Sequence, residues 1–222
     1  MISIKNRDEI LKMRESNRIV ALLLHEVREL IKPGISTKEL DEFAEDLIRK
    51  EGGIPAFKGY QIPGLKPFPG AICASINDCI VHGIPSPEKK LRDGDIIGID
   101  VGVLKNGFYG DGAFTYIVGS STEKIDRLLQ VTKEALNRGI AAAHGIGTQL
   151  HEDPIVPNFG RKGKGPRLRE GMTIAIEPMV NIGTNRVTEK GWEFFVADGS
   201  LSAHFEHTIL ITDNEPEILT RI

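Results

Sequence analysis

The chain has 222 residues and a formal net charge of −3, with 40% hydrophobic and 27% charged residues. These totals fit one large or two small soluble domains, and the net charge gives no reason to expect nucleic acid or an anionic membrane as the main partner. The longest apolar run is IVALLL, and the N-terminus lacks a basic-then-apolar leader. We therefore expect no membrane span and no secretory signal, and we place residues 1–222 in the cytoplasm as a single domain.

The first part of the chain predicts two amphipathic helices, over residues 7–31 and 37–51. In both, apolar residues recur at a spacing of three and four, which places them on one helical face. Each helix also starts with a capping-box pattern, in which Asn or Ser precedes a Glu by three residues. The two cap pairs are Asn6 with Glu9 and Ser36 with Glu39.

Residues 54–70 predict a loop that is dense in Pro and Gly but carries Phe57, Tyr60, Leu65 and Phe68. Large apolar side chains in a loop need a place to bury. The rim of a binding pocket and ordinary loop packing are equally good interpretations of this pattern.

Residues 95–118 predict an antiparallel hairpin, because runs rich in Val, Ile, Phe and Tyr flank Asn106-Gly107. Each arm carries one acid, Asp100 or Asp111. A two-residue turn would place both acids on one face, whereas a three-residue turn would place them on opposite faces. Two carboxylates that are close together and poorly solvated need a cation between them if both are to stay ionised. The alternative to a shared cation is that each acid caps a turn or pairs with a lysine.

Two late strands also carry one acid each, Glu177 and Glu206, in apolar surroundings. One such acid could be a satisfied core residue, but four in one small domain favour a shared cation cluster. With the other elements, the pattern predicts an α+β fold in which helices cover one face of an antiparallel sheet. Those elements are a hairpin at 71–85, a helix at 120–143 and strands within 171–180 and 201–212.

Two histidines are best placed for function, His144 in HGIG and His151 in LHEDP, although a single loop histidine is usually a surface residue. His204 and His207 flank Glu206, and we expect them at most to support the site. Four carboxylates with one imidazole suit two divalent ions such as Mn, Fe or Co better than a thiolate zinc site.

Other catalytic patterns are missing from the sequence, which contains no HExxH, GxSxG or GxxxxGK[ST]. The stretch 161–169 holds five Lys and Arg residues and could touch RNA, for example on a ribosome. A solvated loop is the simpler interpretation of this run.

Six stretches occur in the order found in one known family. They are VHGIP at 81–85, IDVGV at 99–103, YGDGA at 109–113, HGIGTQLHEDP at 144–154, GMTIAIEPMV at 171–180 and HFEHTILIT at 204–212. Together they cover nearly the whole chain, and the sequence resembles a type I methionine aminopeptidase of the pita-bread fold. The resemblance implies a metal-dependent exopeptidase that removes the N-terminal methionine from nascent polypeptides, by attack of a metal-bound hydroxide on the first peptide bond.

The same resemblance implies a role for each site residue. Two divalent ions (Co, Mn, Fe or Zn) would be held by Asp100, Asp111, His144, Glu177 and Glu206. Asp111 and Glu206 would bridge the ions, and Glu177 would also shuttle a proton.

The substrate contacts follow in the same way. His82 and His151 would contact the scissile peptide and stabilise its oxyanion. The methionine pocket would be lined by Tyr60, Phe68, Cys73, Leu150 and Trp192. The loop between Tyr60 and Phe68 looks longer than is usual in the family.

The sequence departs from the family between Ala143 and His144, where the family has a further helix and strand of roughly 25 to 30 residues. We expect this loss to bare the apolar stripe from Ile125 to Ile140 and to leave a sheet edge unpaired. It should also remove the strand that aims His144. The chain is then either a compact variant or a damaged one with impaired activity.

Two other functions remain open. One is a pita-bread binding module without catalysis, which the missing segment favours but the complete set of ligand types does not. The other is a creatinase-like or prolidase-like hydrolase, for whose large N-terminal domain 222 residues leave no room.

Overall fold

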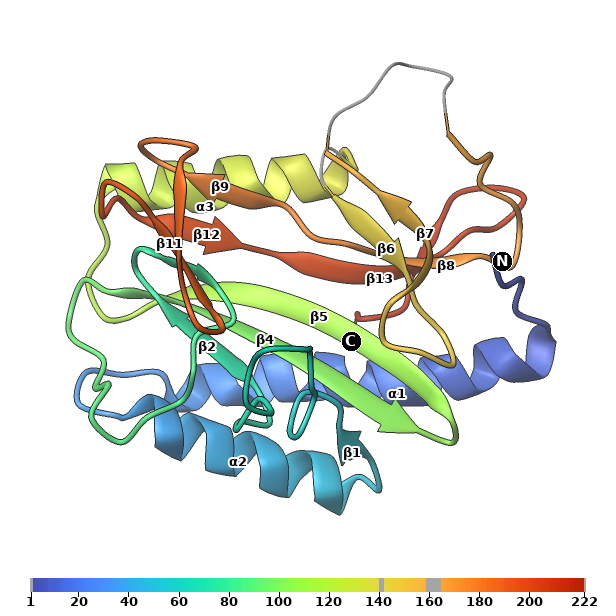
Figure 1. Cartoon of the computed structure of the whole chain (residues 1–222), viewed down its shortest axis with the longest axis horizontal. Coiled ribbons are helices and arrows are strands. Elements are labelled where there is room, and N and C mark those ends of the chain that lie inside the picture. The colour runs from blue at the N-terminus through green and yellow to red at the C-terminus, as the bar shows by residue number, and fades with distance from the viewer. Residues whose placement is uncertain (1, 140–141, 159–164, 222) are drawn as a thin grey trace.

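The computed structural model describes residues 2–139, 142–158 and 165–221. Its helices lie behind a curved sheet (Figure 1) and are α1 (Arg7–Glu26), the 3-10 helix η1 (Val27–Leu30), α2 (Thr37–Lys50) and α3 (Glu123–Asn137). The strands are β1 (Ile54–Pro55), β2 (Cys73–Ile76), β3 (Cys79–Val81), β4 (Ile96–Lys105), β5 (Phe108–Ile117), β6 (Ala143–Gly145), β7 (Glu152–Val156), β8 (Thr173–Ile176), β9 (Met179–Asn181), β10 (Val187–Lys190), β11 (Glu193–Val196), β12 (Ser202–His204), β13 (Glu206–Leu210) and β14 (Glu217–Ile218).

One antiparallel sheet joins the two halves of the chain. Its strand order is β1-β4-β5-β13-β8-β6-β7, with β2 added to β4 and β14 added to β13. The strands β5 and β13 meet where the first half borders the second, and two smaller sheets, β10-β11-β3 and β12-β9, extend the structure. The predicted α+β fold with helices on one face of an antiparallel sheet is confirmed.

The predicted capping boxes are both present. The Asn6 side chain accepts hydrogen bonds from the backbone of Asp8 and Glu9, and Ser36 and Glu39 bond each other reciprocally. These contacts satisfy amide groups that a helix leaves without partners at its first turn. The helix predicted over 120–143 is shorter than expected, because the chain turns at Gly139 with φ +63°.

Alternation along β4 separates the core from the site. Ile97, Ile99, Val101 and Val103 are fully buried against α1 and α2. Period-2 alternation sends Asp100 to the opposite face, away from the helices. The sheet therefore has an apolar face that binds the helices and a second face that carries the acids.

Small residues let α1 approach β5 closely. A Cβ at Gly110 would lie 2.8 Å from the Asn17 backbone nitrogen, so a larger residue there would push the helix away. Close contact of this kind keeps β5, and with it Asp111, rigid against the core.

The apolar stripe of α3 is not exposed to solvent, contrary to the sequence-based expectation. Ile125, Leu128, Leu129 and Leu136 are buried, and they pack with Phe205 and other apolar side chains of the sheet. The stripe has a partner in β9 and β12, so it does not depend on the missing segment for cover. Ile140, the last residue of the expected stripe, lies outside the described residues.

The expected loss of the strand that aims His144 is also wrong. Among the described residues no helix follows α3 before His144, but β6 forms directly and pairs with β8 on one side and β7 on the other. His144 lies opposite Ala175 of β8 and Ile155 of β7. The edge of the sheet is therefore β7, where Ile155 is 66% exposed.

Candidate active site

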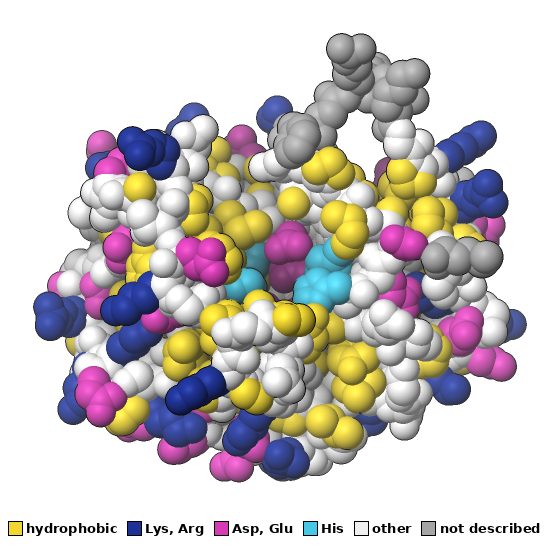
Figure 2. All heavy atoms as spheres, viewed as in Figure 1, with side chains coloured by type: hydrophobic (Ala, Val, Ile, Leu, Met, Phe, Trp, Pro, Cys, Tyr) yellow, Lys and Arg dark blue, Asp and Glu magenta, His cyan; other side chains and the backbone are white. Residues whose placement is uncertain are grey.

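A cavity opens at the centre of the sheet face opposite the helices. Figure 2 shows acidic and histidine side chains at the bottom of this hollow, with apolar side chains around it. Its volume is about 240 Å³. All twelve predicted site residues line it, together with Phe57 and Ile62.

The hairpin turn brings the first two acids together. Asn106 and Gly107 both have positive φ, 52° and 80°, which a two-residue hairpin turn requires. Gly102 is therefore the partner of Asp111, and Asp100 lies diagonally across from it on the same face. The predicted hairpin is confirmed, and its turn has two residues, so that both acids share one face.

Pairing with later strands adds the remaining ligand candidates. Ala113 of β5 is the register partner of both Asp100 and Glu206, so the two acids lie in one row across three strands. Cross-strand partners share a face of the sheet. Residues more than 100 positions apart in the sequence thus converge because β13 lies beside β5.

Three side chains form a compact cluster, Asp111, His144 and Glu206. Each offers one ligand atom, and these atoms lie within 4.8 Å of one another. Glu177 adjoins the cluster, with its Oε1 3.8 Å from Nε2 of His144. Asp100 completes the group on the β4 side.

Burial of this much negative charge strongly disfavours ionisation. The pKa of Asp100 rises to about 8, because of burial and then the charge of Glu177. Burial raises the pKa of Glu177 to about 7. The pKa values of Asp111 and Glu206 also rise, because of burial first and the neighbouring carboxylates second. Without a counter-charge the four groups compete for ionisation.

The donor set fits divalent cations. Oδ1 of Asp100 and Oε1 of Glu206 are buried without a hydrogen-bond partner among the described residues. Buried polar atoms normally have partners, and these two oxygens belong to residues that line the cavity, so they are available to a bound cation. Carboxylate oxygens and one imidazole nitrogen are ligands that Mn, Fe, Co and Zn accept.

Two further histidines lie at the cavity. The ring of His151 lies 4.5 Å from that of His144, centroid to centroid, and its Nδ1 lies 3.3 Å from the Tyr60 hydroxyl. The pKa of His151 falls to about 4, because of burial and then the neighbouring His144 and His82. His151 is therefore neutral near pH 7 and has one ring N–H to donate.

The apolar side of the cavity comes from several elements. Phe68, Cys73 and Leu150 are buried, and Trp192 packs edge-on to Phe68 with ring centroids 5.5 Å apart. Burial, and secondly the charge of Asp100, raises the pKa of the Cys73 thiol well above its usual range. The thiol stays neutral and contributes to an apolar wall.

Two lining residues were not assigned to the site from the sequence. Phe57 is one of the loop aromatics for which pocket rim and loop packing were equally good interpretations, and it lies at the cavity. Ile62 carries no catalytic signal. The only available indication was that the loop between Tyr60 and Phe68 looks long.

We expect the metal-free protein to lose stability as the pH rises from 6.5 to 8. Asp100 and Glu177 have raised pKa values in the folded state, so the folded protein binds more protons than the unfolded chain. Raising the pH through 7 and 8 removes these protons and costs up to about 1.4 kcal/mol per group and pH unit. The histidines with lowered pKa values act oppositely, but only below their usual pKa of about 6.5.

Thermal melting in a chelator checks this pH dependence. The melting temperature should fall by about 2–4 °C for each kcal/mol lost. Added Mn²⁺ should remove most of the fall, because a cation stabilises the ionised carboxylates. A melting temperature that stays flat or rises in the chelator would contradict the prediction.

Acids and imidazoles gathered at the bottom of a partly apolar pocket are typical of metal-dependent hydrolases. The comparisons agree with this class. The model of metallopeptidase family M24 matches residues 11–143 and 141–213, and the chain belongs to this family.

Relatives and solved structures are similar over the whole chain. Methionine aminopeptidase 1 of Bacillus subtilis is 45% identical, with all of both chains covered, and methionine aminopeptidase of Clostridium acetobutylicum is 43% identical, with 99% of both covered. The crystal structure of methionine aminopeptidase from Thermotoga maritima superposes with a TM-score of 0.95 at 41% identity and full coverage of both chains. The resemblance predicted from the motifs is confirmed.

The missing segment is visible in these comparisons. The family match is split, and its two parts meet at residues 141–143, where the sequence predicted the gap. The alignment with the Bacillus subtilis protein spans 254 positions, so at least 32 of them have no counterpart in the 222 residues of this chain.

A more distant structure shows the fold alone. The prolidase from Pyrococcus furiosus superposes with a TM-score of 0.75 at 23% identity, and the match covers 65% of that protein. Among the described helices, none is long and apolar enough to cross a membrane.

Proposed function

We propose that this chain is a metal-dependent aminopeptidase that removes the N-terminal methionine from nascent polypeptides. The main observation is the acid and histidine cluster at the bottom of a cavity with an apolar side. The names of the relatives support the substrate, because those proteins are called methionine aminopeptidases. No observation favours a binding module, since the ligand types remain together in spite of the missing segment.

Each lining residue has a proposed part in the reaction. Asp100, Asp111, His144, Glu177 and Glu206 would hold two divalent ions, with Asp111 and Glu206 at the centre of the ligand set. When bound, such ions supply an activated water and polarise the peptide carbonyl. Glu177, whose raised pKa lies near 7, takes a proton from the attacking water and delivers it to the departing amine.

The neutral histidines orient the substrate. His82 and His151 lie beside the cluster and donate hydrogen bonds to the scissile peptide, where negative charge develops on its oxygen. The Tyr60 hydroxyl can bond Nδ1 of His151 and so fix which nitrogen faces the peptide. Phe68, Cys73, Leu150 and Trp192 exclude water and accept the methionine side chain.

Peptide hydrolysis tests the proposal. With Mn, Fe or Co, the purified protein should release methionine from Met-Ala-Ser, and a chelator should stop the reaction. N-acetyl-Met-Ala-Ser, which lacks a free amine, should stay intact, because an aminopeptidase requires that amine. Preferential cleavage of Xaa-Pro peptides would favour the prolidase alternative, and metal binding without turnover would favour the binding module.

The setting of the reaction is part of the proposal. We place the enzyme in the cytoplasm, where new polypeptides emerge, and we treat residues 1–222 as one catalytic domain because a single sheet spans both halves. Transient contact with the ribosome through the basic stretch 161–169 would bring the enzyme to its substrate. Arg167 and Arg169 of this stretch are exposed, whereas residues 161–164 lie outside the described residues. Co-sedimentation with ribosomes at low and high salt tests the contact.

A further inference from the structure

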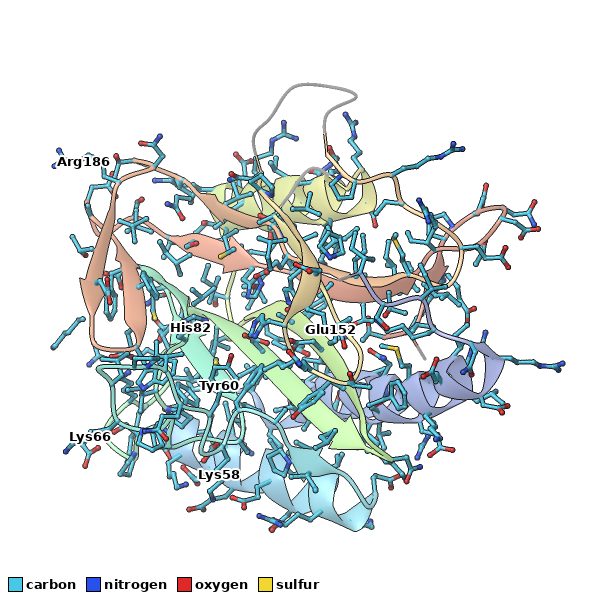
Figure 3. All side chains as sticks on the ribbon, turned by 45° about the vertical axis from the view of Figure 1, so that its right-hand side comes forward. Lys58, Tyr60, Lys66, His82, Glu152 and Arg186 are labelled. Carbon is cyan, nitrogen blue, oxygen red and sulfur yellow. The ribbon has the colours of Figure 1, made fainter. Side chains whose placement is uncertain are left out.

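The loop between Tyr60 and Phe68 forms a closed excursion, residues 61–67, beside the cavity. At its base the Gly59 amide donates to the Phe68 carbonyl at 2.8 Å, and the Phe68 amide donates to the Tyr60 carbonyl at 2.8 Å. The seven residues 61–67 therefore form a loop whose two ends lie next to each other. In Figure 3, Tyr60 at the start of the excursion lies on the same side of the molecule as His82, and Lys66 lies farther out.

The tip of the excursion is a defined turn. Pro63 and Gly64 occupy its two central positions, Gly64 has φ +90°, and the Leu65 amide donates to the Ile62 carbonyl at 3.3 Å. This is a type II turn, which favours proline followed by glycine. The direction of the Ile62 side chain is thus set by local backbone geometry.

A third contact holds the excursion against the pocket wall. Nε1 of Trp192 donates a hydrogen bond to the Lys66 carbonyl at 2.8 Å. Pro63 and Pro67 further restrict the backbone of the excursion. A segment fixed at its base, tip and side acts as a wall and cannot yield easily to a bulky ligand.

Ile62 stands at the outer part of the cavity. It is 38% exposed, whereas Phe68, Cys73 and Leu150, deeper in the same cavity, are at most 5% exposed. For an enzyme that removes the first residue, the deep part accepts that residue and the rest of the peptide leaves through the mouth. The side chain at the mouth therefore meets the second residue of the substrate.

We infer that Ile62 is a specificity-determining residue that limits the size of the second substrate residue. The inference rests on the proposed function and adds a residue outside the family motifs. The rigid excursion holds the branched side chain of Ile62 against this position. A β-branched or larger second residue is disfavoured because the wall cannot move aside.

Exchange of Ile62 in both directions tests the inference. In Ile62→Ala, the ratio of kcat/KM for Met-Val-Ser to that for Met-Ala-Ser should rise about tenfold, the scale on which a few methylene groups alter discrimination. In Ile62→Phe the same ratio should fall. For methionine amide, which has no second residue, kcat/KM should change less in both variants than kcat/KM for Met-Val-Ser.

Leu65→Ala is the matched control, because Leu65 belongs to the same turn and does not line the cavity. It should leave the substrate ratio unchanged. An unchanged ratio in both Ile62 variants would overturn the inference and leave the proposed function standing. Improved cleavage of Leu-Ala-Ser by Ile62→Ala would also overturn it, because Ile62 would then limit the first residue. A wild-type protein inactive on every methionyl peptide would overturn the proposed function, and this inference with it.

Discussion

Replacing Glu206 by glutamine should lower kcat/KM for Met-Ala-Ser at least about a thousandfold, equivalent to about 4 kcal/mol of lost transition-state stabilisation. Glu206 is buried, its ligand atom lies within 4.8 Å of those of Asp111 and His144, and it is a proposed metal ligand. The same change should leave the melting temperature of the metal-free protein equal or higher, because it removes one of four crowded carboxylates. Opposite effects on activity and metal-free stability are the expected result.

Thermal melting with and without Mn²⁺ separates this explanation from simple misfolding. The stabilisation of the wild type by Mn²⁺ should be much smaller in Glu206→Gln, since ligand binding stabilises only the state that binds. Glu189→Gln, at an exposed position on β10, is the matched control and should change neither activity nor melting. A Glu206→Gln protein that keeps its activity within tenfold would refute the role of Glu206 as a metal ligand.

The part of the site on β4 and β5 could be predicted from the sequence, because it depends on local rules. Asn106-Gly107 selects a two-residue turn, and the turn fixes which residues face each other. Alternation then places Asp100 and Asp111 on one face. No contact distant in the sequence is needed for this step.

The convergence of the other acids depends on strand order, which local patterns do not determine. Glu206 reaches Asp100 only because β13 pairs with β5, and His144 reaches the cluster only because β6 pairs with β8. The apolar sequence around each of the four acids indicated that these acids share a cation cluster. The resemblance to a family supplied the arrangement itself.

Two sequence-based expectations were wrong, and both concern the segment that this chain lacks between Ala143 and His144. The expectation for α3 assumed that the lost helix covered its apolar stripe, but Phe205 and the strands β9 and β12 cover it. The expectation for His144 assumed that its strand was lost, but β6 begins at Ala143 and forms a short strand. Short strands need few residues when partners on both sides are already in place, so the chain closes the gap without disturbing the cluster.

Replacing Lys5 by methionine should destabilise the protein by about 3–5 kcal/mol, the usual effect of removing one partner of a buried ion pair. Nζ of Lys5 lies 2.8 Å from Oε2 of Glu152, and the two side chains are only 2% and 10% exposed. Without Lys5, Glu152 keeps its bonds from Thr148 and Gln149 but loses its counter-charge. The melting temperature should fall on the order of 10 °C.

Two comparison variants make the test of Lys5 specific. Lys5→Met combined with Glu152→Gln should recover much of the loss, because the unpaired charge is gone. Arg14→Met breaks an exposed ion pair with Glu217 and should cost no more than about 1 kcal/mol. If Lys5→Met is as mild as Arg14→Met, the buried pair does not hold this region together. If Lys5→Met is strongly destabilising, kcat/KM should fall as well. Glu152 is next to His151 in the sequence, and the Lys5–Glu152 ion pair connects the segment before α1 to the segment that carries this histidine.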